Sequence, residues 1–130
     1  MTINNPDDYI HYRFKRAEES FDDALIMVDN KKWNAAINRL YYSCFYSVIA
    51  LLLKNEMETK THEGTRTMFG KEFIKSGIID KKYGKLYSKL FDFRQKGDYG
   101  DLFDFDKDIV IPLIDQVKEF LAEIKRFVEK

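Results

Sequence analysis

The stretch KWNAAINRLYYSCFYSVIALLLKN, residues 32–55, decides the fold class. Its main apolar face repeats at the spacing of an α-helix and consists of Trp33, Ile37, Leu40, Phe45, Val48 and Leu52. A flanking strip at similar spacing consists of Arg39, Tyr42, Tyr46 and Leu53. A helix with two such sides must be covered from two directions, so we expect this segment at the centre of a helical bundle or against a second subunit.

Helical periodicity continues on both sides of this segment. Apolar positions predict a first helix over residues 7–28, a later helix capped by Asp80, and a final helix that includes Phe127. Residues 60–77 predict a shorter and weaker helix between them. No segment alternates cleanly between apolar and polar residues, so we predict an all-α fold. The expected architecture is an antiparallel four-helix bundle with an additional short helix, forming a single domain over residues 1–130.

Glycine and proline predict where several of these helices begin and end. Gly64 and Gly70 interrupt the short helix. Gly97 and Gly100 are expected to end the helix that starts after Asp80, because glycine adopts the left-handed conformation without a Cβ clash. Pro112 is expected in the first turn of the final helix, where a missing N–H costs nothing.

Composition limits the classes of partner. Lys plus Arg equals Asp plus Glu, 22 each, so the chain has no net field that would attract nucleic acid, and any polyanion must be held by a local patch. The single cysteine, Cys44, is typical of a reducing compartment or an inert buried thiol. The first residues contain no apolar signal region, and no run approaches 18 uninterrupted apolar residues. We therefore expect a cytoplasmic protein without a membrane association.

Metal and cofactor chemistry finds little support. Neither His11 nor His62 follows a glutamate by three positions, as a di-metal bundle site requires. The acidic run around Asp106 imitates a calcium loop, but Ile109 replaces the glycine that the loop's sharp turn needs. Charges at a helix N-terminus explain these aspartates better. The expected metal and cofactor content is none.

Several cationic and aromatic residues are candidates for a functional site, and each also has a structural explanation. Arg94 in FDFRQKGDYGD, residues 91–101, is four positions before Asp98, which also fits a helix-end ion pair. Arg39 fits an arginine stem on the bundle surface whose head pairs with a carboxylate. His62 fits a residue that caps a helix start or donates to a backbone carbonyl. Tyr83 and the lysines around it would suit single-stranded RNA, although such tyrosines are more commonly core residues.

Three segments in order, AAINRLYYSCFYSVIALL, KTHEGTRTMFGKEFIKSGII and LFDFRQKGDYGD, resemble the HEPN domain superfamily, in particular its small stand-alone prokaryotic branch. The likeness extends over residues 5–128. It implies a helical bundle that is commonly a homodimer. Many such proteins in prokaryotes are encoded beside a minimal nucleotidyltransferase as a toxin and antitoxin pair.

The resemblance also implies a site. HEPN ribonucleases cut RNA without metal, using an arginine followed four to six residues later by a histidine near the end of a bundle helix, with two copies meeting across the dimer. Arginine holds phosphate and histidine moves a proton near neutral pH. Arg94 matches this arginine, but Tyr99 stands five positions on and no histidine follows. The candidate catalytic residues are Arg94, Asp98 and Tyr99, and the candidate binding residues are Arg39, Tyr42 and His62.

Two main functions follow from this reading. The first is a dimeric module associated with RNA or a nucleotide, paired with a nucleotidyltransferase in a toxin–antitoxin-like system and lacking the usual catalytic histidine. The second is a metal-independent ribonuclease toxin that uses Arg94 with Asp98, Tyr99 or His62. A narrower alternative makes Tyr99 the target of nucleotidylation by the partner, which adds negative charge at the site. The spacing alone does not show that His62 reaches Arg94.

Overall fold

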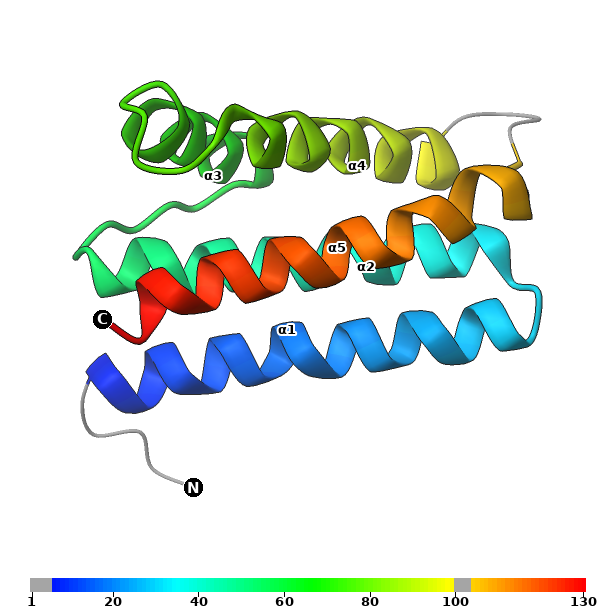
Figure 1. The fold of residues 1–130 in the computed structure, drawn as a ribbon, viewed down its shortest axis with the longest axis horizontal. Helices are drawn as coiled ribbons and strands as arrows, with labels where there is room; N and C mark the ends of the chain where they lie inside the picture. The colour runs from blue at the N-terminus through cyan, green and yellow to red at the C-terminus, as the bar shows by residue number, and fades with distance from the viewer. Residues whose placement is uncertain (1–5, 100–103) are drawn as a thin grey trace.

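The computed structural model describes residues 6–99 and 104–130, without the side chains of Asp98 and Tyr99. Across these ranges every regular element is helical, and the four long helices run antiparallel to one another in chain order (Figure 1). The elements are α1 (Pro6–Asp29), α2 (Trp33–Lys54), α3 (His62–Phe69), the π-helical segment η1 (Gly70–Ile74), α4 (Lys81–Tyr99) and α5 (Lys107–Val128). The predicted all-α bundle with an additional short helix is confirmed.

α2 is the central helix. It contacts α1, α3, α4 and α5, and its residues Ile37, Leu40 and Val48 are fully buried. α2 is also the one helix among the described residues that is long and apolar enough to cross a membrane, but 61% of its most apolar stretch is buried inside the bundle. The main apolar face of α2 is therefore largely covered by the other helices of the same chain, whereas the flanking strip of Arg39, Tyr42, Tyr46 and Leu53 is only half-buried.

An aromatic cluster attaches the short helix α3 to the bundle. The Phe69 ring lies 5.5 Å from the Tyr87 ring and 6.0 Å from the Phe120 ring, measured between centroids. The Tyr87 ring also lies 6.0 Å from the Tyr41 ring of α2. Burial of one aromatic side chain is worth about 1.5–3 kcal/mol, so these contacts hold α3 against α2, α4 and α5.

Two helix boundaries differ from expectation. α4 continues through Gly97 to Tyr99, so Gly97 does not end the helix. A Cβ at Gly97 would lie 3.2 Å from the Phe105 ring, which explains a small residue there by close packing. Gly100 lies outside the described residues. Pro112 lies in the second turn of α5, because the side chain of Asp106 caps the helix earlier by accepting a hydrogen bond from the Ile109 amide at 3.1 Å.

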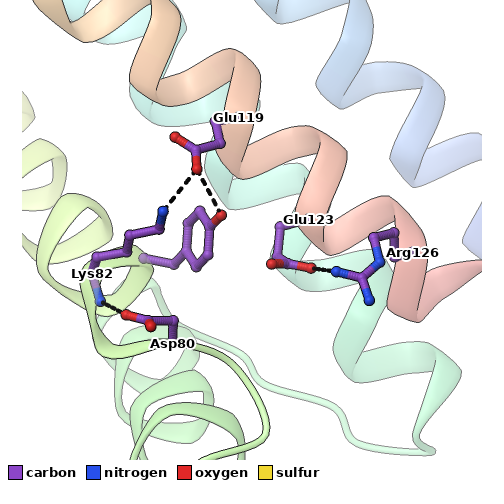
Figure 2. Close-up of polar contacts among 6 residues, drawn as sticks. Asp80, Lys82, Glu119, Glu123 and Arg126 are labelled. Atoms are coloured by element: carbon purple, nitrogen blue, oxygen red, sulfur yellow. Dashed lines mark hydrogen bonds and ion pairs between the residues drawn. The ribbon is translucent and has the colours of Figure 1, made fainter.

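Polar contacts join α4 to α5 on the surface (Figure 2). Asp80 accepts a hydrogen bond from the Lys82 amide at 2.9 Å and so caps α4 as expected, while Glu119 of α5 accepts from Lys82 Nζ at 2.8 Å and from the Tyr83 hydroxyl at 3.1 Å. The Tyr83 ring packs 5.9 Å from the Phe120 ring. Tyr83 is therefore a core residue, and it is not available to stack on RNA beside the exposed lysines.

Candidate functional site

Arg94 points into the bundle from α4. Only 8% of the residue is exposed, and its guanidinium carbon lies 5.0 Å from the centre of the Tyr41 ring and 5.9 Å from that of Tyr42. Its Nη1 donates a long hydrogen bond of 3.4 Å to the Tyr42 hydroxyl. Cation–π contacts with a buried arginine are worth roughly 0.5–2 kcal/mol, so the two tyrosines of α2 fix where the positive charge lies.

His62 contacts the same two tyrosines. It is the first residue of α3, and its Nδ1 is 2.7 Å from the Tyr41 hydroxyl. Its ring lies 5.7 Å from the Tyr42 ring and 4.4 Å from the Phe45 ring, to which it is tilted by 31°. The expectation that His62 caps a helix start or donates to a backbone carbonyl is wrong, because Thr61 caps α3 and the imidazole pairs with a tyrosine from α2.

The electrostatics of this pair keep both groups neutral near pH 7. Burial, and then the charge of Arg94, lower the pKa of His62 below its ordinary value, so the imidazole is neutral at pH 7. Burial raises the pKa of Tyr41 to about 12, although the neighbouring Tyr87 hydroxyl and Arg94 oppose the shift. Tyr41 therefore keeps its proton, and the short contact joins a neutral phenol to a neutral imidazole that is able to accept a proton.

Arg39 adds a second cation. Its guanidinium carbon lies 5.0 Å from the centre of the Tyr42 ring, and its Nε and Nη2 donate to Asn38 Oδ1 at 3.0 and 2.7 Å. Among the described residues Arg39 thus meets an amide oxygen, not the carboxylate that we expected. Because the amide carries no charge, the positive charge of Arg39 is not neutralised by this contact. Tyr42 consequently contacts both arginines.

The structure brings together four of the six candidate residues, namely Arg39, Tyr42, His62 and Arg94. The other two, Asp98 and Tyr99, belong to the last turn of α4, and their side chains lie outside the described residues. We refer to the four together with Tyr41 as the Arg94 cluster.

Tyr41 is the member that sequence reasoning missed. Its ring is fully buried, which made it indistinguishable from a core residue. The available signal was its hydroxyl, because a polar atom on the apolar side of a buried helix needs a hydrogen-bond partner.

The other sequence candidates have structural roles. Asp106 is the N-cap of α5, and Asp104 accepts a hydrogen bond from Asn34 Nδ2 at 3.0 Å. Within residues 6–99 and 104–130, no group of three or more His, Cys, Asp or Glu side chains is placed to hold a metal ion. Cys44 is fully buried, and burial raises the pKa of its thiol, so it is unsuited to nucleophilic chemistry.

The fold and the site define a class: a small antiparallel helical bundle with an arginine turned inward from the C-terminal part of its third long helix. The chain belongs to the HEPN domain family, whose model matches residues 10–127. The chain is 37% identical over 127 residues to the UPF0332 protein of Thermotoga maritima, with 98% of this chain and 96% of the relative covered.

Two further relatives come from Methanocaldococcus jannaschii. The chain is 34% identical over 114 residues to Putative toxin MJ0605, with 88% of this chain and 79% of the relative covered. It is 32% identical over 113 residues to Putative toxin MJ0142, with 87% and 77% covered.

Proposed function

We propose that the chain is the toxin-type member of a pair with a minimal nucleotidyltransferase, and that it acts in the cytoplasm as a homodimeric module that binds RNA or a nucleotide. Family membership and the names of the two M. jannaschii relatives support the toxin-type role. The observation that carries the binding role is the Arg94 cluster, where two arginines and a neutral histidine surround Tyr42.

Phosphate is the ligand that this cluster suits best. Arginine presents a planar fork of donors that matches phosphate oxygens, and a partly buried site strengthens such charge-assisted hydrogen bonds. The contact from Arg94 Nη1 to the Tyr42 hydroxyl is long, at 3.4 Å, so a phosphate oxygen replaces it at little cost. The ring of Tyr42, which contacts both arginines, is half-buried, so the cluster is partly open to solvent.

Binding of labelled single-stranded RNA in the presence of EDTA tests this proposal. Arg94→Ala is expected to weaken affinity roughly 10- to 100-fold, the effect of losing about 1.5–3 kcal/mol of hydrogen bonding to a charged group. Arg126→Ala is the matched control, because Arg126 is exposed on α5 and pairs with Glu123. Equal loss in both variants, or no loss in Arg94→Ala, contradicts the proposal.

A second candidate function is a metal-independent endoribonuclease in which His62 replaces the missing motif histidine. The favouring observation is that the neutral imidazole shares Tyr41 and Tyr42 with Arg94. In this role Arg94 stabilises negative charge on the phosphate and His62 accepts a proton from a ribose hydroxyl.

Cleavage of labelled total RNA in EDTA tests the ribonuclease candidate. Wild-type protein should cut, and both Arg94→Ala and His62→Gln should not. If the wild type leaves RNA intact, the isolated protein is not a ribonuclease and binding stands alone. If His62→Gln cuts as well as wild type, another group moves the proton, and Asp98 and Tyr99 are the next substitutions.

The partner and the modification have separate tests. Co-expression with the neighbouring gene product, followed by size-exclusion chromatography, should give a complex larger than either protein; monomers that ignore the neighbour count against the pairing. Intact mass after incubation with that partner and a nucleoside triphosphate tests Tyr99 as a target. A mass that is unchanged, or that still increases in Tyr99→Phe, rejects this role.

A further inference from the structure

A pocket of about 230 Å³ opens beside the Arg94 cluster, with His62 in its wall. It lies where the N-terminal part of α1, the C-terminal half of α2 and the start of α3 meet. Because His62 belongs both to this pocket and to the Arg94 cluster, a ligand in the pocket contacts the same imidazole as a ligand at Arg94.

The pocket has an apolar floor and aromatic walls. Its aliphatic lining residues are Ile49, Leu52, Leu53 and Met57. Tyr9 from α1 and Phe45 from α2 add rings, and the His62 ring lies 4.4 Å from the Phe45 ring. Concave apolar surfaces with a few polar groups are the usual form of small-ligand sites.

The polar lining of the pocket includes two cations, one carboxylate and several hydroxyls. The guanidinium carbon of Arg13 lies 4.9 Å from the centre of the Tyr9 ring, and its Nε donates to the Tyr9 hydroxyl at 3.1 Å, so the two side chains hold each other in place. Lys60, the carboxylate of Glu58 and the hydroxyls of Thr59 and Thr61 also line the pocket. Each hydroxyl makes one short contact, to Thr65 Oγ1 and to the Gly64 amide respectively, and retains further hydrogen-bonding capacity.

We propose that this pocket binds one unpaired RNA base, next to the phosphate held at the Arg94 cluster. Proteins that bind single-stranded RNA combine aromatic rings, on which bases stack, with cations that follow the backbone, and this pocket has both beside a phosphate-type site. The Thr59 and Thr61 hydroxyls supply hydrogen bonds to the polar edge of the base. This assignment rests on the proposed function, because it places the neighbouring phosphate at Arg94.

The larger groove between α1 and α5 does not have this character. Its lining mixes lysines with carboxylates, among which Lys125 pairs with Glu18 at 3.7 Å, and it includes none of the Arg94 cluster. The small pocket is therefore the cavity whose rings and cations continue those of the Arg94 cluster.

The test uses eight-nucleotide RNAs in which a single abasic residue is moved along the chain, with affinity measured by fluorescence anisotropy. In the wild type, one abasic position should weaken binding about 5- to 150-fold, the effect of losing one stacked base. In the double variant Tyr9→Ala/Arg13→Gln that positional loss should disappear. The control His11→Ala/Lys15→Gln changes neighbouring residues of α1 outside the pocket and should keep it.

The outcomes separate the base site from the proposed function. If RNA binds in an Arg94-dependent way but the abasic loss is the same in wild type and pocket variant, the base site is wrong and the proposed function stands. If no abasic position matters in the wild type, the base site is likewise wrong. If RNA does not bind at all, both fail. Thermal melting identical to wild type establishes that the double variant is folded. As a second variant, Leu53→Trp fills the pocket from α2, and it should also abolish the loss of affinity at the one abasic position.

Discussion

The Tyr41 hydroxyl organises the Arg94 cluster at the scale of single residues. Tyr41→Phe keeps the ring under Arg94 but removes the contact to His62 Nδ1. We expect the free energy of unfolding to fall by about 1 kcal/mol, the usual worth of one hydrogen bond, and the imidazole nitrogen shifts of His62 to change. Chemical denaturation and ¹⁵N NMR measure the two effects. Tyr42→Phe is the matched control, because its hydroxyl contact to Arg94 is long; equal losses in the two variants contradict this account.

His62 should also make stability depend on pH. Its pKa is lowered in the folded protein, so below the unfolded value of about 6.5 the unfolded chain binds a proton that the folded chain does not. The free energy of unfolding should therefore fall as the pH drops from 7 towards the lowered pKa and then level off with respect to this group. Urea denaturation from pH 7.5 to 5 should show a shallower fall in His62→Gln. His11→Gln, at an exposed position of α1, should follow the wild type, and a His62→Gln curve parallel to wild type would refute the assignment.

Some residues of the Arg94 cluster could be predicted from the sequence and others could not. Arg94 was found because its motif is local, and Arg39 and Tyr42 because their spacing puts them on one strip of a helix. The contact between His62 and Tyr41 could not be predicted from the sequence. It depends on the path of residues 55–61, which connect α2 to α3, and on the packing of Phe69 against α4 and α5. Helical period fixes which residues share a face, but it carries no information on distances between elements.

At the scale of elements, alanine substitutions at three glycines distinguish the effect of backbone conformation on stability from the effect of packing. Gly70 has helical dihedral angles, and a Cβ there meets nothing within 4 Å, so Gly70→Ala should stabilise the protein by about 0.5–1 kcal/mol. A Cβ at Gly84 of α4 would lie 3.0 to 3.3 Å from three Ile74 side-chain atoms, so Gly84→Ala should lose that gain or destabilise. Gly77 has φ +85°, and Gly77→Ala should destabilise by about 1 kcal/mol or more. Urea midpoints rank the three variants, and a stability gain in Gly84→Ala equal to that in Gly70→Ala would show that α4 and Ile74 separate easily.

Helix boundaries illustrate the same limit on prediction. Gly97 signals a helix end by its own preference, but Phe105 from the next segment packs against it and α4 continues. Pro112 lies in the second turn of α5 because the helix begins earlier than the proline indicates, at Asp106, whose carboxylate accepts from the Ile109 amide. In both places contacts made by other residues, and not the preference of the glycine or the proline alone, set where the helix begins or ends.

At the scale of the whole molecule, Cys44 reports on how the bundle opens. It is fully buried on the central helix, and burial raises the pKa of its thiol, so the native protein should react with a thiol reagent only when the bundle unfolds. Labelling should be slow in native buffer and immediate in denaturant, and its native rate should rise in destabilised variants such as Gly77→Ala. Rapid and complete labelling of the native protein would mean that α2 is exposed far below the cost of global unfolding.

The bundle architecture was predictable because apolar residues recur at helical spacing and glycine and proline are few. The apolar residues on more than one side of α2 indicated its central place.

The function depends on whether Arg94 and His62 act as one site. A double-mutant cycle on single-stranded RNA affinity, with Arg94→Gln, His62→Asn and the double variant, measures this most directly. If the two residues form one site, the two substitutions should show a coupling energy of about 0.5–3 kcal/mol. Losses that add within about 0.3 kcal/mol would show that the two residues act independently and would contradict a shared site.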